Sequence, residues 1–244
     1  MEVTQKASAF LGVNYKVLYE PNHQLDNVSR EYGRILDHSN YLTSSWSGGT
    51  TTELISYPFG ADFSSRHFLW RVSIATVGKS GAFTRFENIK RIVMLLKGAI
   101  HLRHEGQYEC DLLPFEQDKF NGHFRTFAKI QKGGATNLNL MLNEGAEGEM
   151  RHYALEAGQL HKYTLDSIVA SGEVLPCFSQ AVDLLYNVDG ELRISHSNTQ
   201  QQFYIHPGET FFVSRKSIDT DGVISIQNLS DTLANIVAIG IIHD

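Results

Sequence analysis

The sequence contains few cysteines and prolines, and it has no long apolar run. Its 244 residues include 2 cysteines and 5 prolines. Cys110 and Cys177 form neither a CxxC pair nor a disulfide framework, so we expect two buried thiols in a reducing, cytoplasmic environment. The longest apolar stretches, 92–96 and the glycine-interrupted 236–242, are far shorter than the ~20 residues of a membrane-spanning helix. The N-terminal residues lack the apolar segment of a secretory signal, so none is expected.

Positive charge is also scarce. Lysine and arginine total 21 against 27 aspartate and glutamate residues, which gives a formal net charge of −6 with neutral histidines. No basic stripe is present that could displace counterions from nucleic-acid phosphates. With 42% hydrophobic residues, the chain is long enough to bury a substantial core. We therefore expect a soluble globular protein that binds neither nucleic acid nor membrane.

Helical patterns are rare, and period-two alternation dominates from residue 35 onward. Segment 68–77 alternates in this way, which predicts a strand with two different faces. One face carries Phe68, Trp70, Val72 and Ile74, and the other carries Arg71 and Ser73. An arginine beside a serine is suited to binding a carboxylate, although an ordinary solvent-facing surface gives the same pattern.

Segment 137–143 alternates as well, with leucines on one side. The other side carries Asn137, Asn139, Met141 and Asn143. Asparagine is a poor strand former, so this row either faces water or lines a polar cavity. The sequence leaves both interpretations open.

Turn signals recur about every ten residues, which is typical of a β-sandwich or barrel. Asp189-Gly190 is predicted to close a hairpin between strands at 184–188 and 191–195. The Leu95-Leu96 and Leu184-Leu185 pairs begin loosely similar segments, which favours an internal duplication. We expect an N-terminal domain with an extension over 1–150 and a C-terminal domain over 151–244, packed tightly together.

The most unusual stretch is 46–53, Trp-Ser-Gly-Gly-Thr-Thr-Thr-Glu. Two glycines permit a close backbone approach, while three hydroxyls and a carboxylate supply hydrogen-bonding groups. A simple turn that leads into a threonine-rich strand explains the same residues. The stretch is not a phosphate-binding loop, because it lacks the final Lys-Ser/Thr and no helix is predicted after it.

Eleven histidines raise the question of a metal site. A cupin-type centre uses a His-x-His pair on one strand, a nearby glutamate and a further histidine. His101 and His104 are separated by two residues and would face opposite sides of a strand. We therefore expect no metal and no other cofactor. No Gly-x-Ser-x-Gly motif indicates a nucleophilic serine.

Taken in order, several of these segments resemble the HutD/Ves family of bicupins. The resemblance covers roughly 35–150, more loosely to the end, and rests on segments 46–54, 68–75, 83–86, 91–98, 120–122 and 137–141. It implies an all-β fold in which an RmlC-like jelly roll is duplicated to give two β-barrels. Members are encoded with histidine-degradation enzymes in some bacteria, and a regulatory role through formylglutamate binding has been proposed for them. Here Ser-Gly-Gly follows Trp46 and Asn137 replaces a common aspartate, which would change the ligand.

With this resemblance, we expect a metal-free bicupin that binds a small anionic metabolite in one barrel. Arg71 would pair with a carboxylate of the metabolite. The residues expected to orient or enclose the ligand are Trp46, Thr51, Glu53, Trp70, Ser73, Asn139 and Met141, with the two tryptophans as apolar walls.

Three alternatives stay open at this point. An isomerase or epimerase would use His101 or His123 as a general base inside the cavity. A metal-dependent dioxygenase would contain a stoichiometric metal. A purely structural or regulatory protein would have a barrel filled with side chains. A homodimer is one assembly that we consider.

Overall fold

The computed structural model describes residues 33–61, 63, 66–165, 180–196, 201–216 and 222–244. Within these residues the regular structure is β-strand, and no α-helix occurs. The same residues contain no helix that is long and apolar enough to cross a membrane. Cys110 is half-buried rather than fully buried, and Cys177 lies outside the described residues.

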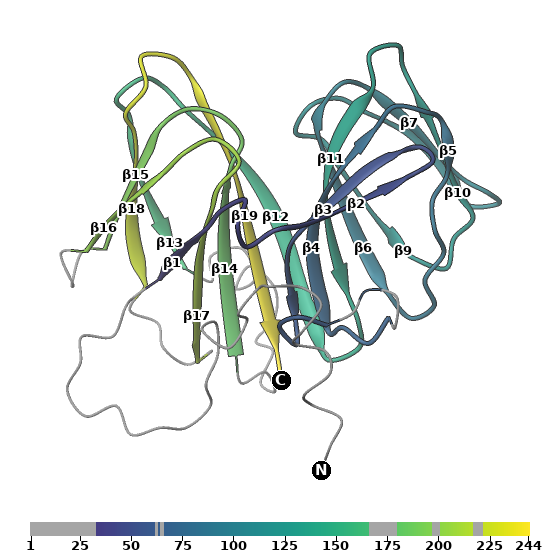
Figure 1. The fold of residues 1–244 in the computed structure, drawn as a ribbon, viewed down its shortest axis with the longest axis horizontal. Helices are drawn as coiled ribbons and strands as arrows, with labels where there is room; N and C mark the ends of the chain where they lie inside the picture. Colours follow the sequence, from purple (N-terminus) through teal and green to yellow (C-terminus); the bar gives the residue numbers. More distant parts are fainter. Residues whose placement is uncertain (1–32, 62, 64–65, 166–179, 197–200, 217–221) are drawn as a thin grey trace.

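Strands β2 to β11 build one half of the molecule, and β12 to β19 together with β1 build the other (Figure 1). The first half contains β2 (Leu42–Trp46), β3 (Gly49–Tyr57), β4 (Trp70–Val77), β5 (Gly81–Ala82), β6 (Lys90–Lys97), β7 (Ile100–His104), β8 (Tyr108–Leu112), β9 (Gln117–Asn121), β10 (Thr126–Ile130) and β11 (Ala135–Leu142). The second contains β1 (Arg34–Leu36), β12 (Ala146–Leu155), β13 (Leu160–Thr164), β14 (Gln180–Asn187), β15 (Leu192–His196), β16 (Gln202–Ile205), β17 (Thr210–Lys216), β18 (Val223–Asn228) and β19 (Ala234–His243).

Each half consists of two antiparallel sheets, and their strand orders reveal a duplication. The first half has sheets β2-β3-β4-β11-β6-β9 and β5-β10-β7-β8, and the second has β1-β17-β14-β19-β12 and β13-β18-β15-β16. Strands β4, β11, β6 and β9 are neighbours in the same order as β12, β19, β14 and β17, whose numbers are each higher by eight. The smaller sheets, β5-β10-β7-β8 and β13-β18-β15-β16, correspond in the same way. The predicted all-β duplicated jelly roll is therefore confirmed. The expected barrels are open two-sheet sandwiches, because no described strand pairing joins the two sheets of a half.

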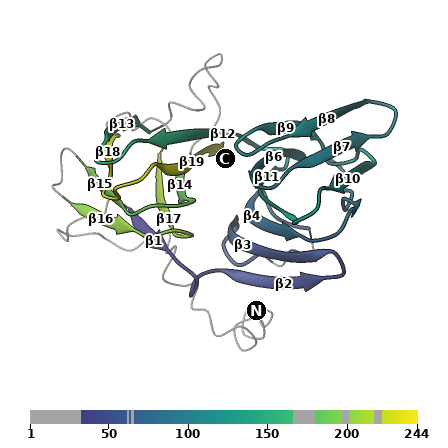
Figure 2. The ribbon, with the colours of Figure 1, turned by 90° about the horizontal axis from the view of Figure 1, so that it is seen from above.

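The chain crosses between the halves near its described start. Strand β1 pairs with β17 of the second half, whereas β2, a few residues later, pairs with β3 of the first (Figure 2). The expected boundary between residues 150 and 151 falls inside β12, which pairs with β19 along its whole length. The division of the chain into 1–150 and 151–244 stays a prediction.

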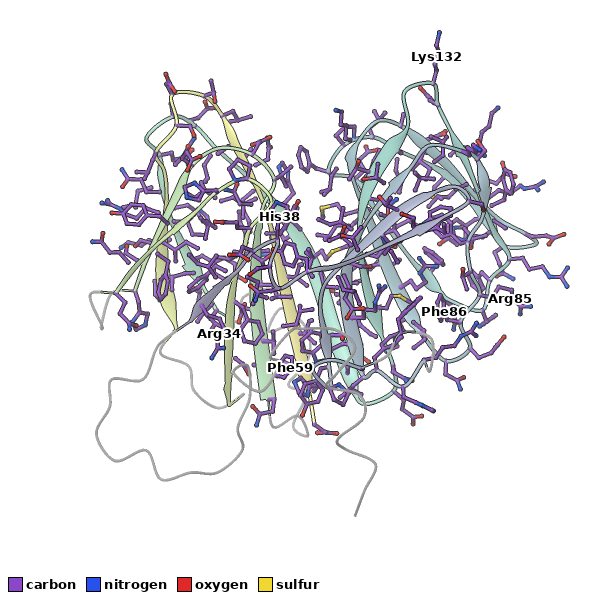
Figure 3. The ribbon with its side chains drawn as sticks, in the orientation of Figure 1. Arg34, His38, Phe59, Arg85, Phe86 and Lys132 are labelled. Carbon is purple, nitrogen blue, oxygen red and sulfur yellow. The ribbon has the colours of Figure 1, made fainter. Side chains whose placement is uncertain are left out.

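The two halves share one apolar core. The Trp70 face of β4 packs with Leu138 and Leu140 of β11 against residues such as Val182 and Ile239 of the second half. Phe59 lies at this seam, with its ring edge-on to both Trp70 and Phe212 (Figure 3). A fully buried large apolar side chain contributes about 1.5–3 kcal/mol, so this core is sufficient to hold the halves together. Trp70 and Val72 of the predicted core face therefore lie on the inter-half face. Phe68, predicted on the same face, precedes β4 and packs instead with Phe86 and Met141.

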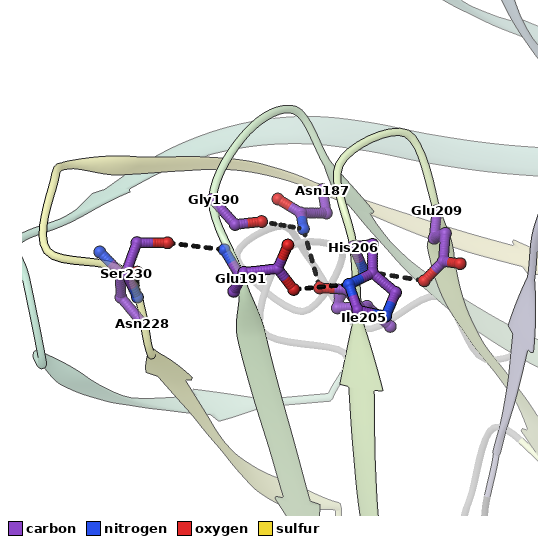
Figure 4. Close-up of polar contacts among 8 residues, drawn as sticks. All are labelled: Asn187, Gly190, Glu191, Ile205, His206, Glu209, Asn228 and Ser230. Carbon is purple, nitrogen blue, oxygen red and sulfur yellow. Dashed lines mark hydrogen bonds and ion pairs between the residues drawn. The ribbon is translucent and has the colours of Figure 1, made fainter.

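The predicted hairpin at Asp189-Gly190 is wrong. Strand β14 pairs with β17 and β19, whereas β15 pairs with β16 and β18, so the turn connects the two sheets of the second half. The Asn187 side chain fixes this crossing by donating to the carbonyls of Gly190 and Ile205, at 2.9 and 3.0 Å (Figure 4). The turn signal was correct, but turn residues alone do not say which strands pair.

Candidate functional site

A cavity of about 340 Å³ lies inside the first half. Its floor is the inner face of the six-stranded sheet, which is the Arg71 face of β4. The described lining residues are Ser44, Ser45, Trp46, Thr51, Phe63, Arg71, Ser73, Ala75, Val77, Ala82, Phe83, Thr84, Phe86, Arg91, Asn137, Asn139 and Met141. This volume falls at the lower end for small-molecule sites.

Strand register places the polar lining residues in rows. Met141 of β11 pairs with Arg71 of β4 on one side and with Arg91 of β6 on the other. Because neighbouring strands are about 4.8 Å apart, the two arginine backbones are separated by roughly 10 Å. The next row brings Asn139 beside Ser73. Two buried guanidinium groups therefore approach one cavity from two strands.

Arg71 is 6% exposed and is paired inside the protein. Its Nε donates to Glu53 Oε2 at 2.5 Å, and its Nη1 donates to Ser73 Oγ at 3.1 Å. The guanidinium also lies 4.0 Å from the centre of the Phe63 ring, in a cation–π contact. Glu53 therefore neutralises the charge of Arg71 and fixes the direction of its fork.

Arg91 is 8% exposed and has no carboxylate within ion-pair distance among the described residues. Its Nη2 donates to Asn139 Oδ1 at 3.0 Å, and its Nη1 is 3.5 Å from the carbonyl of Thr84. No described atom accepts a hydrogen bond from its Nε. A buried cation without a counter-ion is costly, and an anion in the cavity would offset that cost.

The environment of Arg91 disfavours its charge without removing it. Burial first, and then the positive charge of Arg71, lower the pKa of Arg91 to about 10. The group is therefore still protonated at neutral pH. With Glu53 balancing Arg71, these three groups carry a formal charge of +1.

Asn137 and Asn139 of β11 line the cavity, as one of the two interpretations of the asparagine row predicts. Asn143 follows the strand and is not among the described lining residues; its Nδ2 donates to the carbonyl of Phe68 at 3.3 Å. Asn139 links Arg91 to Asn137, because its Nδ2 donates to Asn137 Oδ1 at 2.5 Å. The Nδ2 of Asn137 is buried and has no described partner. An unsatisfied buried donor costs about 1–3 kcal/mol, so a ligand acceptor at this end of the row would be favourable.

Aromatic rings cover the guanidinium groups. The Arg91 guanidinium is 4.9 Å from the Phe83 ring centre and 5.3 Å from that of Phe120. Phe86 also lines the cavity, whereas its neighbour Arg85 extends outward from the first half (Figure 3). At the exposed side, Trp46 Nε1 donates to Thr51 Oγ1 at 3.1 Å. The cavity thus combines positive charge, amide groups and apolar walls.

Six of the eight residues predicted for the site line this cavity. They are Trp46, Thr51, Arg71, Ser73, Asn139 and Met141. Glu53 touches the site through Arg71 and also accepts a hydrogen bond from Ser56 Oγ at 2.9 Å. Trp70 does not reach the cavity, because alternation along β4 turns its fully buried ring toward the second half. There it stacks on Tyr57 of β3 and lies beside His243 of β19.

Arg91 is a charged cavity-lining residue that sequence reasoning missed. It is the second residue of β6, and the five residues after it are apolar, so the segment is typical of a simple core strand. In a strand, Arg91 shares one face with Val93 and Leu95, both of which are fully buried. This spacing was the available signal that Arg91 points into the protein. The cross-strand partner that brings it to Arg71 is not visible in the sequence.

No histidine is among the described lining residues. His101 lies on the outer face of β7 against Glu109 and Asp111, and His123 is exposed. The lining set also contains no aspartate, glutamate, cysteine, lysine or tyrosine. A general base with a suitable pKa is therefore not positioned at this cavity by the residues that the structure describes.

One group of side chains in the described part has metal-ligand atoms close together. Atoms of His104, Cys110 and Asp118 all lie within 4.8 Å of one another. The His104 nitrogens already contact Thr126 Oγ1 and Asp118 Oδ2, each at 2.8 Å. Burial, with nearby Asp118, raises the pKa of the Cys110 thiol to about 11, so it is protonated and a poor ligand. This group is a satisfied hydrogen-bond network.

The ligand set of a cupin-type metal centre does not fit the cavity either. The charged groups that line the cavity are two guanidiniums, which repel a cation, and the neutral lining oxygens belong to amides and hydroxyls.

The interior of the second half is mostly filled by buried apolar side chains, including Leu185, Ile194 and Phe211. The arginine-lined cavity is thus a feature of the first half.

Comparisons with known proteins agree with this fold. The chain is 33% identical over 110 residues to an uncharacterised 21.2 kDa protein in the hutC 3′ region of Pseudomonas putida, covering 44% of this chain and 57% of that protein. It is 33% identical over 95 residues to protein Ves of Escherichia fergusonii, covering 38% and 48%. The matched region thus spans about half the length of these curated relatives.

A solved structure has the same fold. The Pseudomonas aeruginosa PAO1 protein of unknown function PA5104 superposes with a TM-score of 0.66 at 21% identity, covering 86% of this chain and 98% of that one. The family model for HutD matches residues 38–228, which include most of both halves. The chain therefore belongs to the HutD family.

Proposed function

We propose that the first half binds a small carboxylate-containing metabolite in its arginine-lined cavity. The observation that carries this proposal is Arg91, a buried guanidinium with no described carboxylate partner. A ligand carboxylate beside it would supply the missing negative charge and accept charge-assisted hydrogen bonds. Asn137 and Asn139 would bind a neutral polar group of the ligand, and Phe83 and Phe86 its apolar part.

Binding is favoured over proton-transfer catalysis by the composition of the lining. An isomerase or epimerase needs a titratable group within reach of the substrate. The described lining residues offer arginines, amides and hydroxyls, none of which titrates near neutral pH.

We also propose that this binding serves regulation in histidine or related amino-acid catabolism. The support is the Pseudomonas putida relative, whose name places it in the hutC 3′ region. If this is correct, the tightest-binding carboxylate in a metabolite panel will be an intermediate of such a degradation route. A tighter fit for unrelated acids would contradict the pathway assignment and leave the carboxylate site intact.

A thermal-shift screen of small carboxylates tests the binding proposal. A ligand at a hundredfold excess over its Kd stabilises the fold by ~2.7 kcal/mol, or roughly 5–11 °C in Tm for a chain of this size. We expect Arg91→Met to lose this shift while staying folded. Arg103→Met is the matched control, because Arg103 is exposed on the outer face of β7. Equal ligand shifts in all three proteins would overturn the proposal.

A further inference from the structure

We infer that Glu53 makes the cavity selective for monocarboxylates over dicarboxylates, an inference that rests on the proposed function. The argument begins with the charges at the site. Arg71 and Arg91 are the charged residues among the described lining, and Arg71 is already paired with Glu53. One unpaired positive charge is left, and it matches one carboxylate.

Glu53 is held in a position from which it cannot easily turn away. A β-bulge in β3 between Glu53 and Ile55 places Glu53 opposite Ser73 and Ser56 opposite Arg71, so both lie on the Arg71 face of the sheet. Ser56 Oγ then donates to one carboxylate oxygen while Arg71 Nε donates to the other. The Glu53 side chain is 11% exposed, so its charge is weakly screened by solvent.

Arg71 is held equally firmly in this pairing. Its Nη1 is bound by Ser73, and its flat face lies against the Phe63 ring. A second ligand carboxylate would therefore meet an arginine that is already neutralised, with the negative Glu53 behind it. Either repulsion from Glu53 or displacement of Glu53 from Arg71 would weaken dicarboxylate binding.

The test compares butyrate with succinate, which have equal chain length and differ by one carboxylate. Wild type is expected to bind butyrate more tightly, measured by titration calorimetry at neutral pH. Glu53→Gln removes the competing charge and frees Arg71, so the succinate-to-butyrate affinity ratio should rise on the order of tenfold. Glu87→Gln changes the net charge equally at an exposed position outside the cavity, and the ratio should not move.

A double variant distinguishes charge from side-chain shape. Glu53→Gln combined with Arg71→Met returns the formal charge to +1, so the gain in succinate preference should disappear. If Glu53→Gln does not fold, the wild-type preference for butyrate still decides the matter, because tighter succinate binding contradicts the inference.

The inference and the proposed function fail in different ways. An unchanged ratio in Glu53→Gln, with binding of either acid still dependent on Arg91, overturns the inference and keeps the function. No Arg91-dependent binding of either acid overturns both.

Discussion

The two buried arginines of the cavity differ in how far their positive charge is compensated by neighbouring groups. Arg71 has a carboxylate, a hydroxyl and an aromatic face, whereas Arg91 has an amide oxygen, a distant carbonyl and aromatic rings. An incoming anion gains most where a buried charge is least compensated. On this difference we propose anion binding for Arg91 and the shaping of the site for Arg71.

Arg71→Ala is expected to destabilise the protein by about 3–5 kcal/mol, because it leaves the buried Glu53 carboxylate without its partner. Urea unfolding monitored by tryptophan fluorescence measures this loss. Glu53→Gln combined with Arg71→Ala should recover part of it, since no unpaired charge is left. If the double variant is no more stable than Arg71→Ala, the pair does not act as described.

The lowered pKa of Arg91 predicts how ligand binding depends on pH. Burial and Arg71 bring that pKa to about 10, so the guanidinium is charged at neutral pH and is half deprotonated at about pH 10. A bound anion favours the charged form, so affinity should be flat from neutral pH to about 9 and fall above about 10. Calorimetry across this range, with wild type compared to Arg103→Met, checks the profile. A decline that is complete below pH 9 would contradict it.

Strand β4 shows which features of a strand the sequence could predict and which it could not. Its alternation correctly separated Arg71 and Ser73 from Trp70 and Val72. It could not show that both faces are buried, because the second half covers one face and the cavity lies over the other. Trp70 was therefore assigned to a ligand wall when it belongs to the inter-half core.

Substitutions at Trp70 test this placement. Trp70→Ala should cost about 3–5 kcal/mol, because it empties a fully buried position between the halves. Trp70→Phe should cost less, since the buried Trp70 Nε1 has no described partner and its removal relieves an unsatisfied donor. Carboxylate-induced stabilisation should be the same in Trp70→Phe as in wild type. A lost ligand shift in a folded Trp70→Phe protein would place this ring at the site.

The pairing of strands was the other limit of the sequence. Turn residues and alternation located β14 and β15, but sheet membership depends on contacts distant in the chain. The same limit hid the row of Arg71, Met141 and Arg91, whose members come from three strands. Register between distant strands is set by tertiary packing, which a single sequence does not display.

The contact between the two halves makes the stability of the whole molecule depend on pH. His243 is buried beside Tyr57 and Trp70, with ring-centre distances of 4.5 and 5.9 Å, and Asp244 is its neighbour at the chain end. Burial lowers the pKa of His243 below its usual 6.5, against an opposing effect of Asp244. The unfolded chain therefore binds a proton more readily, so stability falls as the pH drops through about 6.5.

His243→Phe should reduce this acid sensitivity. We expect its unfolding free energy to fall less than that of wild type between about pH 7.5 and about pH 5.5, measured by urea titration. His123→Phe, at an exposed position, is the control and should follow wild type. An equal decline in His243→Phe and wild type would show that the inter-half histidine does not govern the acid limb.

The described donor groups also predict the metal content of the molecule. The purified protein should contain zinc, iron, manganese and nickel well below one equivalent, because the cavity is positively charged and the His104 network is already satisfied. Elemental analysis before and after chelation measures this. A stoichiometric metal whose removal abolishes an activity would contradict it.

The most direct test of the central claim is titration calorimetry of the best-binding carboxylate from the screen into three proteins: wild type, Arg91→Met and Arg103→Met. Arg91 is the buried cation that lacks a described carboxylate partner. We predict one site per chain in wild type and Arg103→Met, and loss of binding in a folded Arg91→Met protein. Binding of equal affinity in Arg91→Met would contradict the assignment of this cavity as the anion site.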